Sequence, residues 1–242
     1  MKRTFLAIVF IIFLGLITTS SSYAISFFDN FDDGNADGWW LGYSQHTPWT
    51  NGNWRVENGV LMQDQSGDQF NALVENIQVS NQIIETRLLV NDPSGYGGIT
   101  IWFQNDNNWV NVLIYPAANE VWVIERIDSA NNLFRYPYAS GADNTLYDLK
   151  VDADSTSGDL AVYINDVYLF THTAITPYRN GQSGVNNGNA GGYFDNFNFT
   201  SDPTDKSQCK NNGWKAFNNP AFKNQGACVS YVVSNEYADK RQ

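Results

Sequence analysis

The stretch 97–116 constrains the fold most, because two alternating runs in it are joined by a polar turn. Polar or aromatic residues alternate with aliphatic ones on both sides of the turn at 105–108, which predicts a β-hairpin. A period of two places alternate side chains on opposite faces of a sheet. One predicted face carries Ile99, Ile101, Phe103, Val110, Val112 and Ile114 and should form an aliphatic core.

The opposite face of this hairpin is unusual for a solvent-exposed surface, because it mixes tryptophan and tyrosine rings with amides. It carries Thr100, Trp102, Gln104, Trp109, Asn111 and Tyr115. The run 120–127 continues the pattern, with Glu120 and Trp122 on one face and Val121 and Val123 on the other. Our hypothesis about function depends on this second, aromatic face.

Short alternating runs separated by Asn, Asp, Gly and Pro recur along the chain, and helical periodicity is almost absent. This pattern predicts an all-β fold, a two-sheet antiparallel β-sandwich of the jelly-roll type. The tetrapeptide Phe-Asp-Asn-Phe occurs at 28–31 and at 194–197, and we expect these first and last strands to be near neighbours. The glycine- and asparagine-rich stretch 181–192 is expected to form a flexible loop.

The first 24 residues have the order of a secretory signal peptide, with a basic pair, an apolar run and small residues before a cleavage site at Ala24. The alternative, a membrane anchor, is disfavoured because the apolar run of about 13 residues is shorter than the roughly 20 that span a bilayer. The protein is therefore expected to be secreted and extracellular, without a membrane span after cleavage.

The rest of the chain divides into a predicted sandwich at 25–200, a polar linker at 201–207 and a tail at 208–242. The whole chain has a net charge of −11, which argues against nucleic acid and anionic membranes as partners. Cys209 and Cys228 are expected to pair in an exported protein. Their bridge would close a loop of about 20 residues, worth roughly 3 kcal/mol, and a tail this short needs such a link.

Several segments together resemble the concanavalin A-like lectin/glucanase superfamily, and most closely its laminin G-like and 3-keto-disaccharide-hydrolase-like jelly rolls. They are DNFDDGNADGWW, WRVENGVL, GGITIWFQNDNNWVNV, VYIND and YFDNFNF, within 27–200. The resemblance implies two curved antiparallel sheets, often with carbohydrate on the concave face. The tail, with CKNNGWKAF and FKNQGACVS, is similar to a small C-terminal module of secreted bacterial proteins.

Carbohydrates stack their apolar faces on aromatic rings and pair their hydroxyls with amides and charged groups, so a sugar site combines both. The candidate ligand-binding residues are Glu85, Arg87, Trp102, Gln104, Trp109, Asn111, Tyr115, Glu120 and Trp122. They predict a non-catalytic, lectin-like module that binds a polysaccharide or a cell-surface glycan. The alternative is that loops such as 181–192, or the tail, cover these rings.

Two other functions stay open, a glycoside hydrolase or related sugar-cleaving enzyme, and a structural extracellular adhesion protein. Glycoside hydrolysis needs two carboxyl groups about 5–10 Å apart in one cleft. The Glu-x-Asp-x-x-Glu motif of the family 16 glucanases is absent, and the odd offset from Glu120 to Glu125 places these two on opposite faces. His46 and His172 are isolated in the sequence and are interpreted as non-catalytic.

The resemblance also implies a structural calcium ion on the convex side, held by an aspartate of the last strand and by carbonyls near the first. The matching positions are Asp195, Asp32 with its neighbours from Asp29 onward, and Gly59. One carboxylate with carbonyls and water suits calcium, which takes six to eight oxygen ligands. The alternative is that Asp195 caps a turn or pairs with an arginine.

Overall fold

The structure of the protein is a computed structural model that describes residues 26–44, 52–67, 69–92, 94–139, 145–189, 191–201, 203, 206, 209–210, 213–216 and 222–239. The expected signal peptide, its cleavage site at Ala24, most of the linker, and His46 lie outside these residues. No helix in the described part of the chain is both long and apolar enough to cross a membrane.

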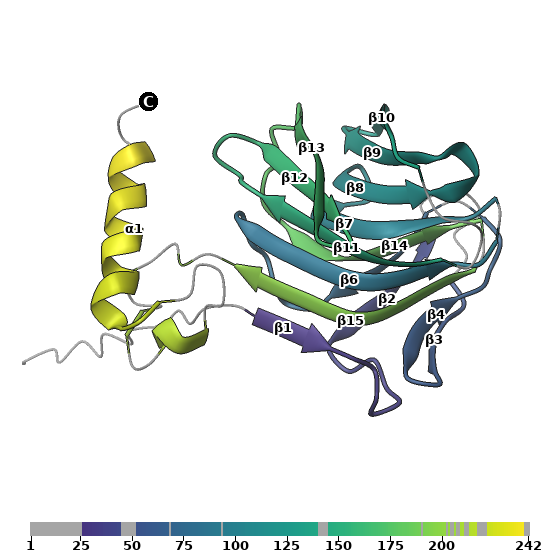
Figure 1. Cartoon of the computed structure of the whole chain (residues 1–242), viewed down its shortest axis with the longest axis horizontal. Helices are drawn as coiled ribbons and strands as arrows, with labels where there is room; N and C mark the ends of the chain where they lie inside the picture. The colour runs from purple at the N-terminus through teal and green to yellow at the C-terminus, as the bar shows by residue number, and fades with distance from the viewer. Residues whose placement is uncertain are drawn as a thin grey trace, which may run out of the picture.

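Two antiparallel sheets are layered face to face, as predicted (Figure 1). In the described residues, sheet A has the order β13-β12-β11-β6-β15-β4-β3, with β1 beside β15. Its strands are β1 (Ser26–Asp29), β3 (Trp54–Glu57), β4 (Val60–Gln63), β6 (Gln82–Val90), β11 (Leu146–Ala153), β12 (Asp159–Ile164), β13 (Val167–Thr173) and β15 (Gly192–Ser201). The first and last strands pair directly, with Phe28 opposite Asn198, which confirms that they are neighbours.

Sheet B has the order β10-β9-β8-β7-β14-β5-β2 in the described residues. Its strands are β2 (Trp39–Ser44), β5 (Phe70–Val74), β7 (Tyr96–Asn105), β8 (Asn108–Tyr115), β9 (Glu120–Ile127), β10 (Ala130–Pro137) and β14 (Gln182–Gly188), with the short helix η1 (Pro116–Ala118) after β8. The β7–β8 pair is the hairpin predicted from 97–116. Its aliphatic face, including Ile99 and Val112, packs against sheet A in the core between the sheets.

A β-bulge in β7 changes the side-chain alternation that the sequence predicts. The pairing with β8 shifts between Ile101 and Asn105, and Trp102 has a φ of +52°. A bulge inserts an extra residue, so the side chains beyond it exchange faces. Trp102 therefore lies in the core, 0% exposed, and Phe103 turns to the outer face. The prediction that Trp102 shares the outer face with Thr100 is wrong.

The stretch expected to form a flexible loop at 181–192 contains strand β14, which lies in the middle of sheet B between β7 and β5. Its amides are held by neighbours, since Asn186 Nδ2 donates to Asn71 Oδ1 across 2.7 Å. Gly184 is needed because a Cβ there would lie 2.0 Å from the carbonyl oxygen of Ala72. Composition alone predicts a loop here. Gly184 instead allows the backbones of β14 and β5 to lie close together.

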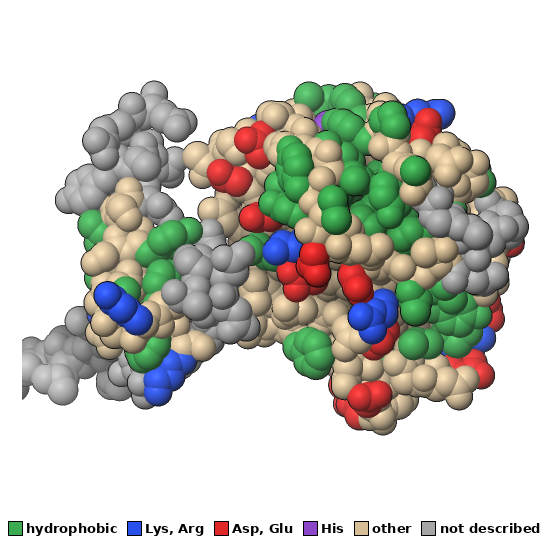
Figure 2. Space-filling model, viewed as in Figure 1, with side chains coloured by type: hydrophobic (Ala, Val, Ile, Leu, Met, Phe, Trp, Pro, Cys, Tyr) green, Lys and Arg blue, Asp and Glu red, His purple; other side chains and the backbone are tan. Residues whose placement is uncertain are grey.

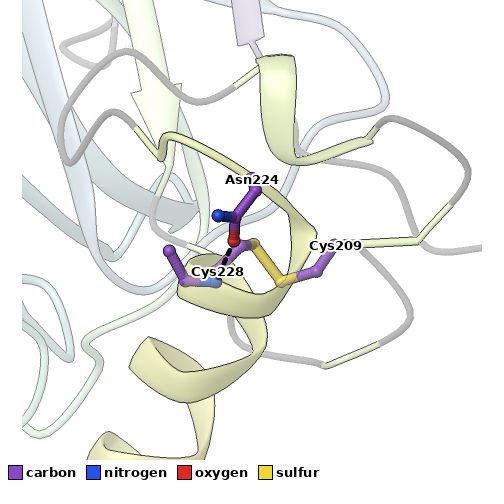
Figure 3. The surroundings of a disulfide bond; sticks show 4 residues. Cys209, Asn224 and Cys228 are labelled. Atoms are coloured by element: carbon purple, nitrogen blue, oxygen red, sulfur yellow. Dashed lines mark hydrogen bonds between the residues drawn. A yellow bond between two sulfur atoms is a disulfide. The ribbon is translucent and has the colours of Figure 1, made fainter.

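The C-terminal module contains the predicted disulfide between Cys209 and Cys228, with their Cα atoms 5.7 Å apart (Figure 3). It also contains a short helix η2 (Gly213–Ala216) and a helix α1 (Gln225–Asp239) that the sequence did not predict. Asn224 Oδ1 accepts the backbone N–H of Ala227 across 2.8 Å, which satisfies a free donor of the first helical turn. The cystine packs with Val232 in a cluster that shares no member with the sandwich core.

Candidate binding face

The outer face of sheet B carries a second apolar cluster, separate from the core between the sheets. Its buried members are Leu73, Tyr96, Phe103, Trp109, Leu113 and Ile124. Three partly exposed rings, Trp40, Tyr115 and Trp122, pack against them. These three rings, at the two sides of the sheet, are the aromatic surface of this cluster that a ligand can reach most easily.

The middle of this face is a buried polar floor made by residues of four neighbouring strands. Thr100 Oγ1 lies 2.9 Å from Asn71 Oδ1 and 2.8 Å from Asn111 Oδ1, and Asn186 also donates to Asn71. All four side chains are at most 1% exposed. A buried network of this kind fixes the strands relative to one another. Asn111, predicted to bind a ligand, is therefore part of the floor.

A pocket of about 330 Å³ opens at the β2–β5 side of the outer face. Its lining residues are Trp40, Glu75, Asn76, Phe103 and Gln182, and we name it the Trp40 pocket. The rings of Trp40 and Phe103 are tilted by 39° with centroids 6.5 Å apart. Gln182 Nε2 donates to the carbonyl oxygen of Val74 across 3.1 Å. Two aromatic walls with a carboxylate and two amides suit a group that is apolar on one side and hydroxylated on the other.

The β9–β10 side of the same face holds a second group, which we name the Trp122 cluster: Tyr96, Tyr115, Glu120, Trp122 and Arg135. Tyr115 meets Trp122 edge to face, with ring centroids 4.5 Å apart. Trp122 Nε1 donates to Glu120 Oε2 across 2.6 Å. The guanidinium carbon of Arg135 lies 5.3 Å from the centroid of the Trp122 ring. The cluster therefore presents charged and aromatic groups together.

The two sites lie on one continuous face but on opposite sides of it. Trp40 is on β2 and Trp122 is on β9, and five strand-to-strand steps separate them in sheet B. At about 4.8 Å per step, this corresponds to about 24 Å across the sheet. Phe103 of the Trp40 pocket and Tyr96 of the Trp122 cluster are both on β7, so an extended ligand can touch both sites by running along β7 or across the strands.

The structure brings together only part of the predicted ligand-binding set. Tyr115, Glu120 and Trp122 meet in the Trp122 cluster, as the period-two pattern suggested. Trp109 is on the same face but only 1% exposed, beneath its neighbours. Gln104 is exposed at the end of β7, where its Nε2 donates to the carbonyl oxygen of Asn180 across 3.1 Å.

Glu85 and Arg87, which the sequence groups with Glu120 as ligand-binding candidates, do not lie on this face. They are on β6, which is a strand of sheet A, and they point to its outer side because Ile84 and Leu88 fill the core. Glu85 pairs with Lys150 at 3.4 Å and Arg87 with Asp148 at 2.9 Å. The hydrogen bond that Arg87 Nε donates to Asp148 Oδ1 raises the pKa of the Arg87 guanidinium. In the view of Figure 2, acidic and basic side chains lie next to one another across the middle of the sandwich.

Sequence reasoning missed the Trp40 pocket and Arg135. Alternation along the strand predicts Phe103 in the core, because it does not reveal the bulge, and composition predicts Gln182 in a loop. Arg135 could have been found, because it stands opposite Trp122 in the β9–β10 pair. A residue directly opposite another in an antiparallel pair shares its face.

The strands of sheet B contain two carboxylates, Glu120 and Glu125, and they point to opposite faces, as their odd offset predicted. Glu125 is fully buried on the core side, where His172 Nε2 lies 2.8 Å from its Oε1. Glu75 follows β5 and lines the Trp40 pocket. Four strand steps separate β5 from β9, which places Glu75 and Glu120 about 19 Å apart across the sheet.

Of the three positions expected to hold calcium, the described contacts place Asp32 near Gly59 but do not place Asp195 near either. Asp32 Oδ1 lies 3.3 Å from the position that a Cβ of Gly59 would take. Asp195 accepts the backbone N–H and the side-chain amide of Asn196, each at 2.7 Å. In the described part of the chain, no three metal-binding side chains lie together, so an ion here would need carbonyl and water ligands besides these carboxylates.

The two curved sheets and their strand order define a concanavalin A-like jelly roll, and similar solved structures support this assignment. No protein-family model matches the sequence, and no curated protein is similar to it. The carbohydrate-binding module CBM66 from Bacillus subtilis is similar with a TM-score of 0.58 at 18% identity, over 68% of this chain and 96% of that chain.

Two glucan-related structures have the same fold. A β-glucanase from Bacillus licheniformis gives a TM-score of 0.54 at 13% identity, over 74% of this chain and 98% of that one. A LamA variant from Z. galactanivorans, in complex with laminaritriose and laminaritetraose, gives 0.54 at 11% identity, over 75% and 100%. At these identities the similarity establishes the fold, and function has to be argued from the residues.

Proposed function

We propose that this protein is a secreted, non-catalytic carbohydrate-binding module that holds a polysaccharide or cell-surface glycan on the outer face of sheet B. The observation that carries the proposal is the presence of two reachable aromatic sites on this one face, the Trp40 pocket and the Trp122 cluster. Each combines rings with carboxylate, amide or guanidinium groups, which is the composition that sugar recognition needs.

The names of similar structures support a sugar ligand for this chain. One is a carbohydrate-binding module, and another was solved with laminarin oligosaccharides bound. An extended oligosaccharide also suits two sites whose outermost rings, Trp40 and Trp122, are on strands about 24 Å apart in the sheet. The disulfide between Cys209 and Cys228 agrees with export, since such bonds persist in oxidising compartments.

The distribution of carboxylates favours binding over cleavage. Glu75 and Glu120, the carboxylates placed at the two sites, are separated by about 19 Å, whereas glycoside hydrolysis uses pairs about 5–10 Å apart. Glu120 is also engaged by the indole N–H of Trp122. A glycoside hydrolase remains the second candidate function, because glucanases are among the similar structures.

The test is to incubate the purified mature protein with a set of immobilised neutral and acidic polysaccharides and to assay the same mixtures for reducing sugar. The proposal expects retention on at least one polysaccharide without release of reducing ends. Release of sugar would assign the hydrolase function. Indifference to every polysaccharide would leave the third alternative, a structural adhesion protein.

A calcium ion beside Asp32 is a separate proposal. Asp32 Oδ2 accepts the amide of Asn30 at 2.5 Å, which leaves its Oδ1 directed toward the turn at Gly59 as a ligand atom. If calcium binds there, adding it to chelator-treated protein raises the melting temperature, and Asp32→Asn removes that rise. An unchanged melting temperature in the wild-type protein would contradict the proposal.

A further inference from the structure

Arg135 stands at the open edge of the proposed sugar-binding face. It is on β10, the edge strand of sheet B, directly opposite Trp122. Its guanidinium lies against the Trp122 ring at 5.3 Å, and its side chain is 57% exposed. A guanidinium that rests on an indole is attracted to the ring and has fewer conformations to lose when it binds a ligand. Arg135 is therefore an exposed cation whose position is restricted by the Trp122 ring.

The guanidinium of Arg135 is paired in charge with Glu120 but makes no hydrogen bond to the residues that the structure describes. The distance from its Nη1 to Glu120 Oε2 is 3.8 Å, longer than the 2.7–3.2 Å or so of a hydrogen bond. That same carboxylate oxygen already accepts the indole N–H of Trp122 at 2.6 Å. Arg135 makes no hydrogen bond to any other residue that the structure describes. Glu120 thus positions the ring beneath the guanidinium, and the guanidinium N–H groups are left for a ligand.

A guanidinium whose N–H groups make no hydrogen bond favours ligand groups that carry a negative charge. Its planar fork matches the two oxygens of a carboxylate, and it pairs equally with the oxygens of a sulfate ester. Charge-assisted hydrogen bonds of this kind are roughly twice as strong as those to a neutral hydroxyl. Resting on the proposed sugar-binding function, we infer that the glycan carries an anionic group, a carboxylate or a sulfate ester, and that this group binds at Arg135.

The Trp40 pocket, at the other side of the face, offers a carboxylate where the Trp122 cluster offers the Arg135 cation. Among the described residues, the Trp40 pocket is lined by the Glu75 carboxylate and by amides, and by no basic side chain. It suits hydroxyls, which donate to a carboxylate. The ligand is therefore expected to place its anionic group at Arg135 and a hydroxylated, uncharged unit in the pocket. The chain's net charge of −11 opposes anions at long range, but at about 0.1 M salt this field decays within about 10 Å, and the contact at Arg135 dominates.

The experiment measures binding of the full mature protein to three classes of probe: uronate polysaccharides (polygalacturonate and alginate), sulfated carrageenan, and neutral glucans and galactans. Wild-type protein should bind an acidic class about 10- to 100-fold more tightly than the neutral polysaccharides. Comparing uronate with sulfate identifies which anion is recognised. Arg135→Gln should abolish this preference, and Arg135→Lys, which keeps the charge without the fork, should retain part of it. Arg87→Gln is the matched control, because it removes the same charge from the outer face of sheet A.

The outcomes separate this inference from the proposed function. Preference for an acidic class that depends on Arg135 and not on Arg87 supports the inference. Binding of neutral polysaccharides alone, or an acidic preference that survives in Arg135→Gln, overturns it and leaves the sugar-binding function standing. Failure to bind any of the three classes overturns both.

Discussion

His172 on β13 and Glu125 on β9 join the two sheets at the edge of the sandwich, with His172 Nε2 2.8 Å from Glu125 Oε1. The same carboxylate accepts the backbone N–H groups of Ile175 at 3.0 Å and Thr176 at 2.7 Å. The other imidazole nitrogen of His172 lies 2.8 Å from the hydroxyl of Tyr136. One buried carboxylate thus satisfies three donors and ties the chain after β13 to sheet B.

Loss of this carboxylate should destabilise the sandwich strongly. We expect Glu125→Ala to lower the free energy of unfolding by about 3–5 kcal/mol, because removing this buried carboxylate leaves three buried donors without an acceptor. Glu85→Ala, which removes an exposed carboxylate paired with Lys150, should cost at most about 1 kcal/mol. Urea unfolding followed by tryptophan fluorescence measures both. Equal effects in the two variants would contradict the structural role of Glu125.

Trp102 should contribute mainly to the stability of the fold, and Trp122 mainly to glycan binding. Trp102 is fully buried in the core and donates its N–H to the carbonyl oxygen of Ser80 at 2.7 Å. Trp102→Ala is therefore expected to cost about 3–5 kcal/mol of stability. Trp122→Ala should cost less, since its ring is partly exposed, but should weaken glycan binding. The comparison uses urea unfolding and binding measured on the folded fraction, and it fails if Trp122→Ala is the more destabilising change.

The sequence predicts the two-sheet architecture because turn chemistry and alternation are local properties of the chain. Asn58 and Gly59 both have positive φ, at 55° and 75°, as the hairpin turn predicted there requires. The bulge at Trp102 could not be read in the same way, since a bulge is fixed by how β7 pairs with β8 and β14. A single inserted residue places the Trp102 side chain in the core and turns Phe103 to the outer face of sheet B.

The candidate site was only partly predictable for a second reason. Period-two alternation tells which residues of one strand share a face, but it does not tell which strands share a sheet. Glu85 and Glu120 were grouped together, whereas β6 and β9 belong to different sheets. Tyr115 and Trp122 were grouped correctly, because β8 and β9 follow each other and pair directly.

The Asp152 carboxyl gives a pH-dependent contribution to stability. It lies between Ala161 and Ile83 on neighbouring strands, and burial raises its pKa, while Lys150 lowers it less. A carboxyl with a raised folded-state pKa opposes folding when it is ionised, and this penalty disappears as the pH falls toward the unfolded-state pKa. Asp152→Asn should therefore stabilise the protein at pH 7 by about a few tenths of a kcal/mol.

The measurement is urea unfolding of wild type and Asp152→Asn as a function of pH. The difference between the two should vanish below about pH 3, where the carboxyl is protonated in both states. A difference that grows on acidification would show that the sign of this contribution is wrong.

The disulfide should matter to the C-terminal module alone. The bond closes a loop between positions 19 residues apart, so its loss is worth about 3 kcal/mol to a small module. In the double variant Cys209→Ser and Cys228→Ser, we expect the helical circular dichroism of α1 to decrease. Urea unfolding of the sandwich should be unchanged, because the two apolar clusters share no residue. A lower unfolding midpoint of the sandwich would show that the module supports it.

The central claim, that glycans bind to the outer face of sheet B, is tested most directly by comparing one aromatic residue on the outer face of each sheet. Trp40 lines the pocket on sheet B, and Tyr168, which is 54% exposed, lies on the outer face of sheet A. Affinity for the bound polysaccharide is measured by calorimetric titration of Trp40→Ala and Tyr168→Ala. The account predicts a loss of about tenfold or more in Trp40→Ala and wild-type affinity in Tyr168→Ala. Wild-type affinity in Trp40→Ala, with loss in Tyr168→Ala, would contradict it.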